Sequence, residues 1–103
     1  MRVRRLGKSY AHPLVVLVVL PDADGKIHVG VTAGRSVGKA VQRNRGKRML
    51  REAVRSLLPM IKPGWKFILI SRSPILYAQL PELETTLFQL FRKAGLINEN
   101  HGT

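Results

Sequence analysis

The 103-residue sequence contains no cysteine and only six acidic residues. Without cysteine, disulfide frameworks, thiolate zinc sites and cysteine nucleophiles are all excluded. With so few carboxylates, no cluster is available for a nuclease that holds its own metal ions. Long apolar runs are also absent: the longest uncharged run is the 13 residues 9–21, whereas a transmembrane helix needs roughly 20 apolar residues. We therefore expect a cytoplasmic protein that does not enter the membrane.

Positive charge, in contrast, is abundant. Eighteen Lys and Arg residues against six Asp and Glu residues give a net charge of +12 and a pI of about 11.4. Such a surface favours a polyanion as partner, nucleic acid first and an acidic membrane surface second. Apolar residues make up 45% of the chain, which is enough to build a folded core. Because no linker or repeat interrupts the sequence, we expect residues 1–103 to form one nucleic-acid-binding domain.

Three apolar segments have the length and composition of β-strands. Leu14–Leu20 is short, β-branched and bounded by prolines, which predicts a strand buried on much of both faces. Ile27–Ala33 alternates apolar and polar residues, and the turn chemistry of Asp22–Gly25 precedes it, so we expect it to pair with the first strand as a hairpin. Trp65–Ser71 is predicted to be the third strand.

Two amphipathic helices are predicted from a period of 3.6 residues. The first covers about residues 39–58, and its apolar stripe consists of Gly46, Leu50, Ala53, Val54, Leu57 and Leu58. The second runs from about Pro81 to Ala94, with Gly95 as its C-terminal stop. Its apolar stripe consists of Leu83, Leu87, Leu90, Phe91 and Ala94. The order β-β-α-β-α predicts a two-layer α+β fold, a sheet with helices packed on it.

Charge is concentrated on the first of these helices and the loop before it. Eight of the eighteen basic residues fall between Arg35 and Arg55, opposed only by Glu52. On a helical wheel one broad face collects Asn44, Arg45, Lys47, Arg48, Arg51 and Arg55. Like charges four residues apart destabilise a helix by about 0.2–0.5 kcal/mol per pair, so the pattern favours neutralisation by phosphates over a merely solvated face. Arginine suits this role because it binds phosphate through two hydrogen bonds.

The same segment resembles a known family. Lys39–Glu52, KAVQRNRGKRMLRE, resembles the Arg-Asn-Arg helix of the bacterial ribonuclease P protein subunit. The flanking segments GKSYA at Gly7, KPG at Lys62 and FRKAGL at Phe91 resemble that family in the same order, so the resemblance covers nearly the whole chain. It implies an α/β sandwich with a left-handed β-α-β crossover, whereas such crossovers are generally right-handed.

The resemblance also implies a function. In this family an RNA subunit performs the catalysis, and the protein binds that RNA and helps to hold the 5′ leader of precursor tRNA. It therefore implies no catalytic residue and no cofactor bound by the protein alone, with magnesium acting together with the RNA subunit. Matched by motif, the RNA contacts are Arg35, Lys39, Arg43, Asn44, Arg45, Lys47, Arg48 and Arg51. The helical wheel adds Arg55, and Lys8 and Tyr10 are candidate leader contacts.

Three features depart from the family pattern. Ser36 stands where a second basic residue is common, and Gly46 replaces a bulky aliphatic residue at a cost of about 1 kcal/mol of helix propensity relative to Ala. Residues 1–7 resemble only the last turn of the family's first helix, which predicts a truncated remnant of that helix. Without the helix, the apolar strand Leu14–Leu20 would be exposed, so we expect weak self-association.

The remaining candidates favour structural roles. Asp22 and Asp24 fit a turn better than a metal site, and His12, His28 and His101 lack metal-ligand spacing. Core positions are expected for Trp65, Phe67, Phe88 and Phe91, whereas Tyr10 and Tyr77 are better placed to stack on RNA bases. The alternative function is a non-catalytic RNA-binding or ribosomal-type protein, which would share the basic helix.

Overall fold

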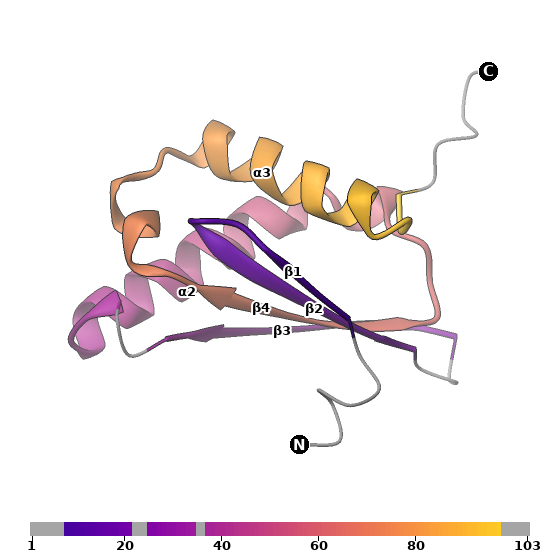
Figure 1. Cartoon of the computed structure of the whole chain (residues 1–103), viewed down its shortest axis with the longest axis horizontal. Helices are drawn as coiled ribbons and strands as arrows, with labels where there is room; N and C mark the ends of the chain where they lie inside the picture. The colour runs from indigo at the N-terminus through magenta and orange to yellow at the C-terminus, as the bar shows by residue number, and fades with distance from the viewer. Residues whose placement is uncertain (1–7, 22–24, 35–36, 98–103) are drawn as a thin grey trace.

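The structure, a computed structural model, describes residues 8–21, 25–34 and 37–97. These residues form two layers, with a four-stranded sheet on one side and both described α-helices on the other (Figure 1). The strands are β1 (Lys8–Ala11), β2 (Val15–Pro21), β3 (Ile27–Ala33) and β4 (Trp65–Ser71). The helices are α2 (Ala40–Arg55) and α3 (Leu80–Lys93), with the 3₁₀ turns η2 (Leu58–Met60) and η3 (Ser73–Tyr77). The predicted α+β class is confirmed.

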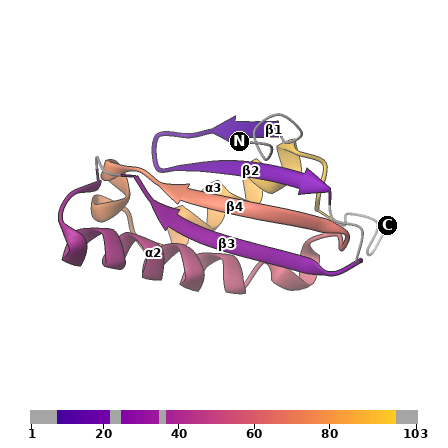
Figure 2. The same ribbon diagram turned by 90° about the horizontal axis from the view of Figure 1, so that it is seen from below.

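The sheet order corrects one prediction and adds a strand. The order is β1-β2-β4-β3, so the predicted hairpin between β2 and β3 is wrong (Figure 2). β4 lies between them, antiparallel to β2 and parallel to β3. Phe67 and Leu69 of β4 are fully buried and Ile68 and Ile70 are half-buried, and a strand that is apolar on both faces buries most area at the centre of a sheet. β2 forms its hairpin with β1 instead.

The segment β3-α2-β4 is the crossover unit that contains the basic helix. β3 and β4 run parallel, with all seven residues of each strand in register from Ile27 opposite Trp65 to Ala33 opposite Ser71. α2 connects them and packs against both strands. The crossover itself is therefore present, and its left-handedness stays a prediction.

The core lies between the sheet and the two helices. The predicted stripe is buried at Gly46, Leu50, Ala53 and Val54 of α2. The helix ends at Arg55, earlier than predicted, so the buried Leu57 follows it and the half-buried Leu58 begins η2. On α3 the stripe is buried at Leu83, Leu87, Leu90 and Phe91, and Ala94 is half-buried. The Phe67 and Phe91 rings meet edge to face, with centroids 5.0 Å apart. Trp65 and Phe88 are partly buried against the same core.

The end of α3 is fixed by a glycine. Gly95 has φ +80°, and the amide of Leu96 donates to the Phe91 carbonyl over 3.0 Å. This is the Schellman arrangement, which confirms the predicted stop. It directs Leu96 and Ile97 into the core, where Ile97 forms a β-bridge with Ile61.

Several predictions fall on residues outside the described part of the chain: the remnant helix at 1–7, Asp22, Asp24, Arg35, Ser36 and His101. The predicted exposure of Leu14–Leu20 is wrong, because every residue of this segment is buried except the half-buried Val16. No helix in the described ranges combines the length and the apolar character needed to cross a membrane.

Candidate nucleic-acid interface

The exposed side of α2 carries a continuous stripe of basic and amide side chains. Asn44, Arg48, Arg51 and Arg55 recur every three or four residues and are all exposed, as is Arg45 beside them. At 1.5 Å per residue, Asn44 and Arg55 are about 16 Å apart along the helix axis. The helix runs along the β3 side of the sheet (Figure 2). Arg51 and Arg55 line a hollow together with Val29 and Val31 of β3. We call Asn44, Arg45, Arg48, Arg51 and Arg55 the basic stripe.

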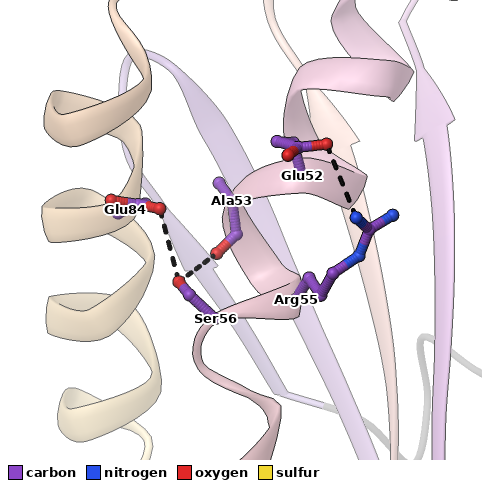
Figure 3. Close-up of polar contacts among 5 residues, drawn as sticks. All are labelled: Glu52, Ala53, Arg55, Ser56 and Glu84. Atoms are coloured by element: carbon purple, nitrogen blue, oxygen red, sulfur yellow. Dashed lines mark hydrogen bonds and ion pairs between the residues drawn. The ribbon is translucent and has the colours of Figure 1, made fainter.

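The positive charge of the basic stripe is largely uncompensated. Arg55 Nη1 lies 3.8 Å from Glu52 Oε1, and the two side chains are 73% and 54% exposed. An ion pair this exposed contributes only about 0–1 kcal/mol. Within the described ranges no carboxylate pairs with Arg45, Arg48 or Arg51. Glu84 of α3 accepts a hydrogen bond of 3.4 Å from Ser56, the residue that follows α2 (Figure 3).

Arg43 has a different environment from the stripe. It lies seven residues before the buried Leu50, which places it on the same side of the helix, and it is half-buried. Its Nη1 donates to the Gly38 carbonyl over 2.7 Å. This hydrogen bond therefore links Arg43 to the loop that leads into α2 and stabilises that loop.

The same loop is held by the start of the helix. The Lys39 amide donates to Gln42 Oε1 over 2.8 Å. Gly38 has φ +129°, and a Cβ at this position would collide with the Gln42 side chain. The exposed Lys39 thus stands at a helix start whose backbone geometry is tightly defined.

Gly46 determines how closely α2 approaches the sheet. A Cβ at this position would lie 3.1 Å from Ser71 Oγ and 3.4 Å from Ile75 Cγ2. Ser71 is fully buried, and its hydroxyl donates to the Thr32 carbonyl over 3.4 Å. The sequence predicts only a cost in helix propensity at Gly46, whereas the structure shows that this residue permits close packing against β4 and η3.

The structure does not bring all the predicted contacts together. Lys47 is half-buried at the flank of the stripe. Lys8 and Tyr10 lie on β1, separated from β3 by β2 and β4, at roughly three strand spacings of 4.8 Å. They pair with Val19 and Leu17, so they share the face that packs on the helices. There they line a hollow of ≈ 280 Å³ with Trp65 and Leu96.

One exposed cation at the end of β4 carries no signal in the sequence. Arg72 follows β4 directly, and its amide donates to the Leu14 carbonyl over 3.0 Å. Its guanidinium reaches the His12 carbonyl at 3.4 Å. No sequence signal marks Arg72, because only the parallel pairing of β3 and β4 places the end of β4 near the loop that enters α2. Tyr77, in the turn that follows, is 87% exposed.

The described residues contain no group of three or more His, Asp or Glu side chains arranged to hold a metal ion.

The fold and the basic stripe together define a small α/β protein with a face suited to a polyanion. Comparisons with known proteins identify the family within this class. The family model described as Ribonuclease P matches residues 1–95. The chain therefore belongs to the ribonuclease P protein family, the protein components of the ribonucleoprotein endoribonuclease that processes the 5′ end of tRNA.

Individual relatives agree with this assignment. The ribonuclease P protein component of Symbiobacterium thermophilum is 45% identical over 92 residues, covering 88% of this chain and 80% of the relative. That of Herpetosiphon aurantiacus is 38% identical over 95 residues, covering 92% and 77%. The RNase P protein of Staphylococcus aureus has the same fold, with a TM-score of 0.79 and 23% identity over 94% of this chain and 89% of that chain. The RNase P protein of Thermotoga maritima also gives a TM-score of 0.79, with 23% identity over 89% and 87%.

Proposed function

We propose that this protein binds the RNA subunit of ribonuclease P through α2 and the loop before it, and that the RNA performs the cleavage. The observation that carries the proposal is the basic stripe, whose arginines are exposed and largely unpaired on a helix anchored by a buried opposite side. Arginines held in this way meet phosphates without first breaking internal ion pairs. Family membership supports this function over the ribosomal-type alternative.

The proposed RNA contacts divide into two groups. The basic stripe, Lys47, Lys39 and Arg35 are proposed to contact the RNA directly. Arg43 is proposed to act by holding Gly38, in the loop before the helix. Magnesium is proposed to act with the RNA subunit, and the cytoplasm is the proposed compartment for both partners.

A second surface is proposed for the 5′ leader of precursor tRNA. The sheet face opposite α2 and α3 carries apolar residues at its centre, among them Ile68 and Ile70, with the exposed Lys66 and Thr32 near them. A single strand of RNA could lie there with its bases on the aliphatic surface and its phosphates beside Lys66. Lys8 and Tyr10 point to the other face, so they would contact a leader only where it passes around the β1 edge. Weak self-association stays a prediction, which sedimentation velocity at two salt concentrations tests.

The test is reconstitution with a bacterial ribonuclease P RNA and precursor tRNA at low magnesium. The variant Arg45→Ala, Arg48→Ala, Arg51→Ala removes three charges from α2. A matched control, Lys62→Ala, Arg92→Ala, Lys93→Ala, removes three exposed charges elsewhere and has the same net charge. Only the α2 variant should weaken RNA binding, with the slope of log K against log salt falling by up to about one unit per lost phosphate contact.

Two results would contradict the proposal. Equal loss of RNA affinity in both triple variants would mean that net charge alone matters and that α2 is not the binding site. Leader cleavage by protein and magnesium without the RNA, surviving nuclease treatment of the preparation, would mean that the protein is itself the nuclease.

A further inference from the structure

The two edges of the sheet are protected to different degrees. β1 is only four residues long, begins with Lys8 and is followed closely by Pro13, all of which discourage pairing with another strand. β3 is seven residues long and contains no proline and no Lys, Arg, Asp or Glu. Its register with β4 is continuous, so no bulge distorts it. Within the described residues β3 is paired on one side only, which leaves a regular edge open to another strand.

The direction of the free main-chain groups follows from two hydrogen bonds at the ends of β3. The Gly34 amide donates to the Ser71 carbonyl, and the Lys26 carbonyl accepts from the Gly64 amide. Residues 26 and 34 therefore point their main-chain groups toward the β4 side. Because this direction alternates along a strand, Val29 and Val31 point theirs toward the open edge.

A hollow lies beside this open edge. It has a volume of ≈ 280 Å³ and lies between β3 and α2, lined by Val29, Val31, Arg51, Val54, Arg55 and Leu58. Val29 and Val31 are half-buried, and both arginines are exposed. The bottom of the hollow is therefore apolar, and two guanidinium groups lie on its helix side. Beside it, the main-chain amide and carbonyl groups of Val29 and Val31 face the open edge.

We propose that the β3 edge binds an extended acidic segment of another protein, which adds a fifth strand to the sheet. Val29 and Val31 would supply main-chain hydrogen bonds, the hollow would take apolar side chains, and Arg51 and Arg55 would pair with flanking carboxylates. A second copy of this chain fits less well, because each copy carries a net charge of +12. It would also bring its own Arg51 and Arg55 to the interface, where like charges repel. This inference goes beyond the proposed RNA function and does not depend on it.

The probe is the acetylated and amidated heptapeptide ETVTVTE, tested with the full chain without RNA. In a strand its two valines and two glutamates share one side, as the hollow and its arginines require. Binding should slow hydrogen exchange at the Val29 and Val31 amides by at least about tenfold at saturation. The matched peptide KTVTVTK should not bind, and the double variant Arg51→Glu, Arg55→Glu should reverse this preference. Both substituted side chains are exposed, so the fold is retained.

Backbone methylation separates strand addition from simple charge attraction. One version of the acidic peptide is N-methylated at its valines and another at its threonines. Since only alternate amides of an added strand face β3, one version should lose binding and the other should keep it. Equal behaviour of the two versions, or unchanged exchange at Val29 and Val31, would overturn the proposal. Equal protection of these amides by a single-stranded oligonucleotide would assign the groove to RNA instead.

Discussion

Gly46 offers a quantitative test of how α2 is seated on the sheet. Replacing Gly by Ala inside a helix contributes about 1 kcal/mol through helix propensity. Here the new Cβ would lie 3.1 Å from Ser71 Oγ, closer than ordinary contact, and 3.4 Å from Ile75 Cγ2. The hydroxyl of Ser71 is buried and hydrogen-bonded to Thr32, so it cannot withdraw without weakening that bond. We expect the gain and the crowding nearly to cancel, so that Gly46→Ala alone changes stability by less than about 0.5 kcal/mol.

A double-mutant cycle separates the gain in helix propensity from the crowding at Ser71. In a Ser71→Ala background the crowding oxygen is gone, and Gly46→Ala should then stabilise by about 1 kcal/mol, or raise Tm by about 4–8 °C. Urea unfolding of the four proteins, followed by circular dichroism, measures each free energy of unfolding. Full stabilisation by Gly46→Ala with Ser71 still present would refute the argument, because the contact with Ser71 would then not limit the approach of α2.

Three further predictions concern single positions. Leu50→Ala should lower the free energy of unfolding by about 2–5 kcal/mol, as measured by urea denaturation, because it leaves a cavity at a fully buried site. Gly95→Ala should cost about 1–2 kcal/mol in the same assay, since φ is +80° there and a Cβ disfavours that conformation. Arg43→Ala should weaken RNA binding while changing the salt slope less than Arg48→Ala, because Arg43 holds Gly38 and Arg48 is free to meet phosphate; equal slopes in filter binding would contradict this.

Local pattern was sufficient to predict the helices but not the arrangement of the strands. The buried stripes of α2 and α3 follow the period of 3.6 residues, so the sequence predicts them almost residue by residue. The position of β4 between β2 and β3 depends on contacts across more than thirty residues, which no local turn signal encodes. β1 was not predicted because its four residues, KSYA, are too short and too polar to show alternation.

In the candidate site, too, local pattern predicts some features and distant contacts decide the others. Exposure of Arg45, Arg48 and Arg51 follows from the helical wheel. The role of Arg43 does not, because its bond to Gly38 depends on the path of the loop that enters the helix. Lys8 and Tyr10 were expected near the leader, and only the register of β1 on β2 shows that they face the helices.

The central place of β4 has a consequence for how the protein is made. A ribosome releases β2, β3 and α2 before residues 65–71, yet β2 and β3 do not pair with each other and share β4 as their neighbour. The buried side of α2 packs against β3, which is made earlier, but also against β4, η3 and α3, which are all synthesised later. An unfinished chain therefore carries the arginines of the basic stripe on a helix that lacks most of the elements it packs against. We expect firm capture of the RNA subunit to begin only after translation has passed α3, so that the topology itself keeps partly made protein out of the assembling enzyme.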